Sequence, residues 1–346
     1  MNAWPWALLG VVFLGTGALA AAPQDAADSG TLADPPASSG ATQPTNLDTF
    51  LFALPTTHDH VGRVIVPVKI NGLGPFRFLV DTGANHSTIS PGLVQTLGLK
   101  TRGEATIVLD GITGSAHVPY VAVDKLQVGD LTLQGTALPV VWAPVMAGAD
   151  GILGAAGLAD KTLLIDFQRN RVAIANRIDS SARTPVTRIH ALRVANGLLI
   201  MEARVGGVRT EAVLDTGSER TLGNLALRNA LKLRNRSGRG FVAKLTSVYG
   251  ATTEVETGEI QRAPAISIDT LSITDVALVF GDFHIFKVWE MQDRPALILG
   301  MDVLGTVTSL NVDFRNRDVY VGSPQTGGGE MRDAFRNVLS DQAMKR

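Results

Sequence analysis

The 346-residue chain contains no cysteine, which excludes a disulfide framework, thiol catalysis and attachment of a lipid to a cysteine. It has no excess of positive charge either. Its 31 lysine and arginine residues are balanced by 32 aspartate and glutamate residues, so the net charge of -1 gives no reason to expect nucleic acid as a partner. Hydrophobic residues make up 45% of the chain, which is enough for a real core and excludes global disorder.

The one long apolar run lies at the N-terminus, over residues 3–22. It ends in small residues, with Ala18-Leu19-Ala20 in the A-x-A arrangement of a cleavage site, so residues 1–22 are expected to be a signal peptide. No lysine or arginine precedes the run, and its length also suits an uncleaved membrane anchor. Either way we expect an exported protein that touches a membrane only through this segment. The absence of cysteine fits a bacterial periplasm or cell envelope.

The rest of the chain is expected to be mainly β structure. Residues 23–47 are mostly small and polar and are typical of a flexible linker. Short alternating runs follow, such as VIVPVKI over residues 64–70, and turn pairs such as Asn71-Gly72 separate them. Only short helices are expected, at 93–97 and 225–231. Residues 323–346 are expected to form a linker and a C-terminal amphipathic helix.

The tripeptide Asp-Thr-Gly occurs twice, as Asp81-Thr82-Gly83 and Asp215-Thr216-Gly217, each time after an apolar run. Alone, either copy would most often be a turn. The surroundings repeat as well: residues 61–83 resemble residues 196–217, GILG at 151–154 resembles LILG at 297–300, and a similar hairpin follows each of these. The repeat divides the body into two lobes, residues 48–178 and 179–322.

Each lobe also contains a glycine-tipped hairpin beyond its Asp-Thr-Gly. Gly111 and Gly114 mark the tip of the first hairpin, and Gly250 marks the tip of the second. A hairpin of this kind is usually only a loop, but it can also cover a site as a mobile lid. Because both lobes carry one, we expect two lids. Tyr120, just past the first tip, is either a flap residue or a structural residue of a half-buried strand.

Two aspartates brought together from duplicated lobes would lie too close for both to ionise. Asp81 and Asp215 would then share one proton, so that one activates a water molecule as a base while the other protonates a carbonyl oxygen as an acid. This chemistry needs no metal, no other cofactor and no covalent intermediate. The threonines of the tripeptides would hold the two loops to each other. The glycines would let the backbone approach and donate N–H groups.

These residues resemble the aspartic proteases of the pepsin and retropepsin type. The quoted pieces are Asp81-Thr82-Gly83-Ala84 with Ile152-Leu153-Gly154, and Asp215-Thr216-Gly217-Ser218 with Ile298-Leu299-Gly300. The resemblance covers about residues 51–322 and implies an all-β, two-lobed acid-protease β-barrel fold with the active site between the lobes. It also implies that Asp81 and Asp215 form the catalytic pair within one chain and cleave proteins or peptides bound in an extended form.

Within that family the chain is most similar to bacterial retropepsin-like exported proteases, given its short lobes, its two lids and Ala84 after the first tripeptide. Ser218 after the second tripeptide resembles pepsins instead. A Ser218 hydroxyl could donate a hydrogen bond to the outer oxygen of Asp215, whereas Ala84 cannot do this for Asp81. We therefore expect Asp215 to be the more acidic of the two.

Several other interpretations stay open at this point. The main alternative function is a catalytically silent peptide-binding or scaffold protein of the envelope. A metal site at His58-Asp59-His60 is weighed against a polar strand entry, which is the more ordinary explanation. His86 either tunes the dyad or holds a loop. Asp166 and Asp313 are explained by turn chemistry.

Overall fold

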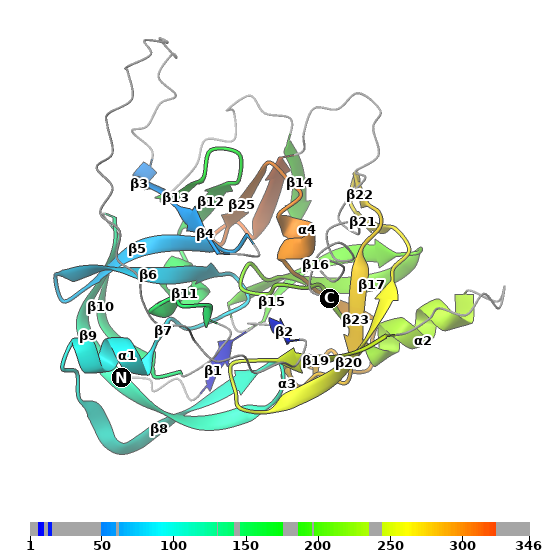
Figure 1. Ribbon diagram of the computed structural model, residues 1–346. Coiled ribbons are helices and arrows are strands. Elements are labelled where there is room, and N and C mark those ends of the chain that lie inside the picture. The colour runs from blue at the N-terminus through cyan, green and yellow to red at the C-terminus, as the bar shows by residue number, and fades with distance from the viewer. Residues whose placement is uncertain are drawn as a thin grey trace, which may run out of the picture.

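The computed structural model describes residues 6–9, 13–15, 50–59, 62–129, 131–141, 146–175, 186–195, 197–234 and 244–322 (Figure 1). The expected linker over residues 23–47 and the expected C-terminal helix lie outside the described residues. No helix within the described part of the chain is long and apolar enough to span a bilayer.

The first lobe is built on a nine-stranded sheet in the order β1-β8-β9-β5-β6-β11-β7, with β10 on β9 and β4 on β5. Asn71 and Gly72 both have positive φ, as a tight two-residue hairpin turn between β5 and β6 requires. Ser90 caps helix α1, which begins with Pro91. The elements are β1 (Trp6–Leu9), β4 (Thr57–His58), β5 (Val64–Ile70), β6 (Leu73–Asp81), β7 (Thr88–Ile89), α1 (Pro91–Thr96), β8 (Thr101–Gly111), β9 (Ser115–Val128), β10 (Leu131–Pro139), β11 (Gly151–Gly154) and the 3-10 helix Ala155–Leu158.

The second lobe repeats this plan in an eleven-stranded sheet. The order is β2-β19-β20-β23-β18-β24-β17-β16-β21-β22, with β15 on β16. Its elements are β2 (Phe13–Gly15), β15 (Arg193–Ala195), β16 (Leu198–Val205), β17 (Val208–Leu214), β18 (Leu222–Asn224), α2 (Leu225–Arg234), β19 (Lys244–Tyr249), β20 (Val255–Arg262), β21 (Ile266–Ile268), β22 (Leu271–Ile273), β23 (Ala277–Gly281), α3 (His284–Val288), β24 (Ala296–Leu299) and α4 (Met301–Leu304). The predicted short helices correspond to α1 and α2.

A third sheet joins the lobes, because β12 of the first lobe pairs antiparallel with β25 of the second. In each of its two equivalent hairpins an aspartate accepts a backbone N–H three residues later, from Arg169 to Asp166 and from Asn316 to Asp313, both at 2.9 Å. The predicted turn chemistry is therefore confirmed. The strands are β3 (Phe50–Pro55), β13 (Arg171–Ala175), β12 (Thr162–Asp166), β25 (Ser309–Asp313), β26 (Asp318–Gly322) and β14 (Val186–His190).

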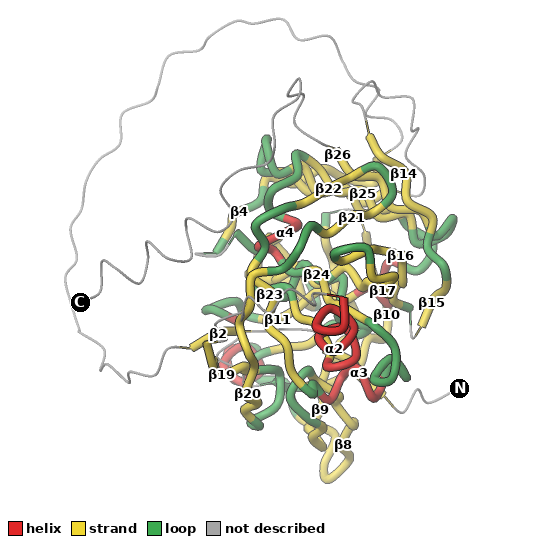
Figure 2. The backbone as a smooth tube through the Cα atoms, turned by 90° about the vertical axis from the view of Figure 1, so that its right-hand side faces the viewer, coloured by secondary structure: helices red, strands yellow, loops and turns green. Residues whose placement is uncertain are grey.

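This joining sheet lies at one end of the molecule, and the β8–β9 and β19–β20 hairpins lie at the other (Figures 1 and 2). The two Asp-Thr-Gly tripeptides contact each other where the lobes meet. The all-β, two-lobed architecture expected from the repeat is confirmed.

The described residues at the N-terminus form two short strands. β1 runs parallel to β8, with Leu9 opposite Gly111, and β2 runs antiparallel to β19, with Phe13 opposite Tyr249. The backbone of one N-terminal segment therefore pairs with both glycine-tipped hairpins.

Candidate active site

The sheets of the two lobes place the two aspartates at equivalent strand ends. β6 ends at Asp81 beside the parallel strand β11, and β17 ends one residue before Asp215 beside the parallel strand β24. The glycine after each Ile-Leu pair fits closely under the neighbouring loop. A Cβ atom added to Gly154 would lie 2.5 Å from the carbonyl oxygen of His86, and one added to Gly300 would lie 2.5 Å from that of Arg220. Each Ile-Leu-Gly strand therefore supports the Asp loop of its own lobe.

The threonines of the two tripeptides bind the loops to each other. The N–H of Thr82 donates to Oγ1 of Thr216 at 3.1 Å, and the N–H of Thr216 donates to Oγ1 of Thr82 at 3.2 Å. Each hydroxyl also donates across the lobe boundary, from Thr82 to the carbonyl of Leu214 at 2.9 Å and from Thr216 to that of Val80 at 2.7 Å. Four buried hydrogen bonds thus fix the spacing between the two loops.

The two carboxyl groups are held face to face. Oδ1 of Asp81 accepts the N–H groups of Gly83 and Ala84 at 2.8 and 2.9 Å, and Oδ1 of Asp215 accepts those of Gly217 and Ser218, both at 2.9 Å. Each carboxyl group is close enough to the other to influence its pKa. Among the described residues, no group donates to either Oδ2 atom. The Oδ2 atoms are thus left to the shared proton and to a reacting molecule.

The glycines make this close approach possible. A Cβ atom added to Gly83 would lie 2.4 Å from Cγ of Asp215, and one added to Gly217 would lie 2.3 Å from Oδ2 of Asp81. Each glycine therefore leaves room for the aspartate of the opposite lobe, so any larger residue would displace a carboxyl group.

Burial sets the acidity of the pair, since Asp81 is 1% and Asp215 0% exposed. Burial raises the pKa of Asp81 to about 6, although Asp215, two backbone N–H groups and the positive charge of Arg63 act to lower it. Burial and the charge of Asp81 raise the pKa of Asp215 well above its ordinary value. These directions favour Asp81 as the ionised partner and Asp215 as the one that holds the proton.

The expectation that Asp215 is the more acidic partner is thus wrong. Its premise fails because the hydroxyl of Ser218 donates to the backbone carbonyl of Arg220 at 2.8 Å instead of to Asp215. The cation that favours an ionised carboxylate is Arg63, in the first lobe. The sequence did not single out Arg63, because nothing in its local pattern separates a buried arginine from an exposed one.

Two further residues near the site were not predicted from the sequence. The hydroxyl of Ser87 accepts the N–H of Gly154 at 3.1 Å, and that of Thr221 accepts the N–H of Gly300 at 3.1 Å. They occupy equivalent positions of the two lobes, so extending the repeat a few residues beyond the tripeptides would have found them. Asp302 accepts the Thr221 hydroxyl at 2.6 Å, and burial raises the pKa of Asp302.

The tips of the two glycine-tipped hairpins contact each other. Gly111 and Gly114 lie at the tip between β8 and β9, where the N–H of Gly111 donates to the carbonyl of Gly114 at 2.8 Å. A Cβ atom added to Gly250 of the other hairpin would lie 2.7 Å from the Thr113 hydroxyl, which is itself 3.1 Å from that of Thr252. The structure thus brings Gly111, Gly114 and Gly250 together.

Each hairpin tip packs on the opposite lobe. Ile112, which is fully buried, belongs to an apolar cluster of the second lobe that includes Leu222 and Phe283. Ala251 belongs to a cluster of the first lobe that includes Ile65 and Leu79. The lids are therefore closed against each other and against the opposite lobes.

A polar contact also joins the first lid to the second lobe. Nε2 of His284, at the start of α3, lies 3.2 Å from Oδ1 of buried Asp110 and 3.1 Å from the hydroxyl of Ser115, which donates to the same Oδ1. Serine, histidine and aspartate in this order suggest a charge relay, but a relay needs both ring nitrogens of the histidine. Here one nitrogen faces both partners, so the group is a lid contact.

The remaining candidates lie away from the dyad. Tyr120 is partly buried in β9, where it pairs with Pro139 of β10. Asp59 of the proposed metal motif binds Arg63, and His60 lies outside the described residues. Among the residues that the structure describes, no three histidine, aspartate or glutamate side chains are grouped to hold a metal. The backbone carbonyl of His86 packs against Gly154.

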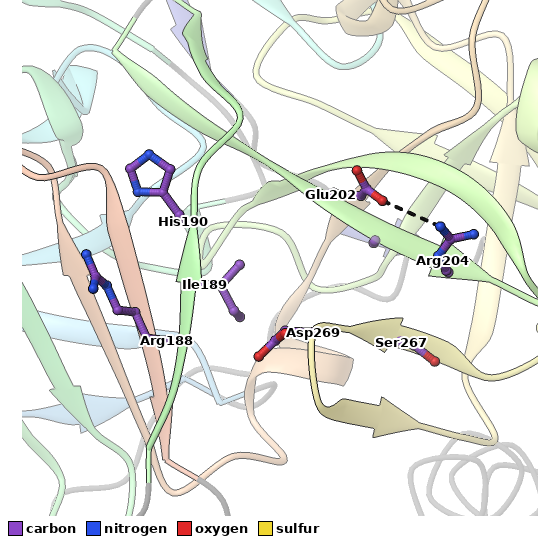
Figure 3. Close-up of a pocket in the computed structure, with 8 residues that line it drawn as sticks. Arg188, Ile189, His190, Glu202, Arg204, Ser267 and Asp269 are labelled. Atoms are coloured by element: carbon purple, nitrogen blue, oxygen red, sulfur yellow. Dashed lines mark ion pairs between the residues drawn. The ribbon is translucent and has the colours of Figure 1, made fainter.

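A hollow of about 320 Å³ lies on the outer face of the second lobe and the joining sheet (Figure 3). Of the residues that line it, Arg188 and His190 bind Asp318, Arg204 binds Glu202, and Asp269 contributes a further carboxylate. No residue of either Asp loop lines it.

A family model described as aspartyl protease matches residues 66–156 and 201–303, which together make up more than half of the chain. The chain belongs to the aspartyl protease family. The two matched segments fall in the two lobes and contain both Asp-Thr-Gly tripeptides and both Ile-Leu-Gly strands. A search among curated proteins found none that matches this aspartyl protease family member.

Proposed function

We propose that the protein is an aspartic endopeptidase that cleaves extended polypeptides between the two lobes. The observation that carries this proposal is the buried pair Asp81 and Asp215, held together by the crossed threonine hydrogen bonds, with each aspartate against the glycine of the opposite loop. Such a pair is what general acid–base activation of water requires. The dyad is completed within one chain, so we expect the monomer to be active.

The residues take distinct parts in the reaction. The Asp81 carboxylate removes a proton from water as the water oxygen bonds to the carbonyl carbon of the substrate, and Asp215 donates its proton to the carbonyl oxygen. The tetrahedral product then breaks its C–N bond as the nitrogen takes the proton from Asp81 and Asp215 takes back a hydroxyl proton, which leaves a carboxylic acid and an amine. No charge accumulates on the carbonyl oxygen, since it is protonated as the water attacks.

The lids support an extended substrate. Both hairpins present outer strands, β8 and β19, whose backbone groups already pair with the short strands β1 and β2. A polypeptide that added a strand in this way would gain affinity from its backbone and selectivity from alternate side chains. Closed lids would exclude water other than the reacting molecule. We further propose that the protein acts in a bacterial periplasm or envelope after export.

Cleavage of an unfolded protein by the purified chain tests the proposal. Wild type should cut it, a pepstatin-like transition-state mimic should inhibit cutting, and Asp81→Asn and Asp215→Asn should each lose roughly a thousandfold or more in kcat. Equal cleavage by all three proteins would point to a contaminating protease. A wild type that binds the mimic and the unfolded protein without cutting would instead favour a silent peptide-binding protein.

A further inference from the structure

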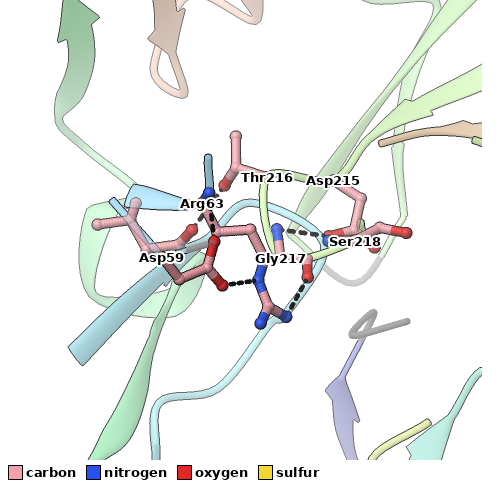
Figure 4. Close-up of polar contacts among 7 residues, drawn as sticks. Asp59, Arg63, Asp215, Thr216, Gly217 and Ser218 are labelled. Atoms are coloured by element: carbon pink, nitrogen blue, oxygen red, sulfur yellow. Dashed lines mark hydrogen bonds and ion pairs between the residues drawn. The ribbon is translucent and has the colours of Figure 1, made fainter. Parts of the chain in front are cut away.

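The strongest unassigned feature is a fully buried arginine behind the dyad. Arg63 directly precedes β5, and its side chain is 0% exposed. Its Nε lies 2.6 Å from Oδ2 of Asp59, which is 3% exposed, and its backbone N–H donates to Oδ1 of the same carboxylate at 2.9 Å (Figure 4). Burying two charges is costly, so a pair in this place calls for an explanation beyond stability.

The other end of this guanidinium reaches the second lobe. Nη1 of Arg63 donates to the carbonyl of Gly217 at 3.2 Å, across 154 positions of sequence (Figure 4). Gly217 in turn packs against Oδ2 of Asp81. The cation therefore lies behind the peptide that covers Asp81, while its counter-ion Asp59 lies on the far side of the guanidinium from Gly217.

The arrangement occurs in one lobe only. The repeat aligns Arg63 with Leu198, because Ile65 pairs with Leu79 and Ile200 with Val213, and Leu198 carries no charge. The other parts of the two loops are nearly symmetric, since each threonine, glycine and backbone N–H has a counterpart. Arg63 therefore makes the two loops electrostatically unequal.

We propose that Arg63 is a positioning residue: held by Asp59, it fixes the Asp215 loop through Gly217 and directs the negative charge of the dyad to Asp81. The inference rests on the proposed function, for which one aspartate must be the base. It assigns that part to Asp81 through a residue outside both tripeptides. A purely structural ion pair would instead stabilise the fold and leave the protonation of the dyad unchanged.

Three substitutions separate these two accounts by the sign of their effects. Asp59→Asn leaves the charge of Arg63 uncompensated, so Asp81 should ionise at lower pH. The double variant Arg63→Met with Asp59→Asn removes both charges, so Asp81 should ionise at higher pH, by roughly one pH unit. Arg63→Lys keeps the charge and should keep the wild-type midpoint, while losing kcat because it no longer holds both partners in a fixed fork.

The measurement is the titration of the dyad in the full chain by NMR with ¹³C-labelled aspartate, assigned with Asp81→Asn and Asp215→Asn. Opposite shifts for Asp59→Asn and the double variant support the inference. Coinciding midpoints in wild type and all folded variants would overturn it. If the double variant does not fold, an unshifted Asp59→Asn is sufficient to overturn it.

The same titration keeps this inference apart from the proposed function. Opposite shifts in a wild type that does not cleave would leave the role of Arg63 standing and contradict the endopeptidase. Cleavage by wild type, without any shift of the dyad titration in the variants, would support the endopeptidase and contradict the role of Arg63.

Discussion

Gly83 and Gly217 are the residues on which the approach of the two carboxyl groups depends. Each glycine lies so close to the aspartate of the opposite lobe that no Cβ atom could be accommodated there. The contact is with a carboxyl group, which cannot give way without breaking the backbone hydrogen bonds to its Oδ1 atom. The glycine of each Asp-Thr-Gly therefore makes room for the aspartate of the other lobe, and the two tripeptides fit together only as a pair.

This leads to a prediction for two conservative substitutions. Gly83→Ala and Gly217→Ala should each lower kcat by roughly a hundredfold or more, since a shift of about 1 Å at a reacting group has effects of this size. Steady-state cleavage of an unfolded protein measures it. Gly92→Ala is the matched control, because a Cβ atom there meets nothing within 4 Å. Full activity in Gly83→Ala would contradict the close approach of the carboxyl groups.

The acidity of the dyad predicts the pH dependence of catalysis. The pKa of Asp81 is raised to about 6, so the closed enzyme should lose its base, and kcat should fall, as the pH drops through about 6. Burial and the charge of Asp81 raise the pKa of Asp215, which favours Asp215 as the partner that keeps the proton. A kcat profile whose acid limb lies near pH 4 would contradict this assignment.

Stability should change in the opposite direction. An aspartate whose pKa is higher in the folded than in the unfolded state stabilises the fold below its unfolded pKa and loses this contribution as the pH rises through the folded value. The contribution of Asp81 should therefore be present below about pH 4 and lost by about pH 6. The fold thus gives up stability over the range in which the base becomes available.

At this scale the sequence predicted the site residues but not their electrostatics. The aspartates, threonines and glycines follow from the repeat, because a duplicated motif implies that its copies meet. The role of Ser218 does not follow from the repeat, because a serine hydroxyl can donate to several nearby acceptors and here donates to the carbonyl of Arg220. Arg63 carries no local signal, since its partner Gly217 is 154 positions away.

Among the elements, the lids connect the two lobes most directly. Ile112 of the first lid is buried in the second lobe, and Ala251 of the second lid is buried in the first. Opening either lid would expose apolar surface and separate the Thr113 and Thr252 hydroxyls. The sequence predicted two lids from their glycines, but it could not show that the lids cross, because neither hairpin contains a signal for its partner.

Shortening the buried lid residue should favour the open form. Ile112→Ala should weaken closure by roughly 2–4 kcal/mol, the usual cost of truncating a fully buried isoleucine. Amide hydrogen exchange over residues 107–118 should become faster and KM should rise. Leu245→Ala is the control, because this second-lid side chain is 68% exposed. Exchange rates equal to those of wild type would contradict the packing of Ile112 on the second lobe.

The N-terminal strands give a second prediction at this scale. Leu9 pairs with Gly111 of the first lid, and Phe13 pairs with Tyr249 of the second. The four residue steps from position 9 to position 13 can span at most about 13 Å. A chain that retains residues 1–22 should therefore have a kcat/KM several-fold lower than one that lacks them. Equal kcat/KM values, with equal exchange at β8 and β19, would show that β1 and β2 do not compete with substrate.

For the whole molecule, the structure places a complete dyad within a single chain. The joining sheet, the threonine hydrogen bonds and the crossed lids all connect residues of the two lobes. The sequence predicted this arrangement because the tripeptide, the Ile-Leu-Gly strand and the hairpin recur in the same order. It could not show how the lobes face each other, which depends on contacts between residues more than a hundred positions apart.

Active-site titration tests the central claim most directly. A tight-binding pepstatin-like mimic should abolish cleavage by the monomer at one molecule of mimic per chain. Asp81→Asn and Asp215→Asn should neither cleave nor bind it tightly. A stoichiometry of one mimic per two chains, or full activity in either variant, would contradict a single dyad built from Asp81 and Asp215.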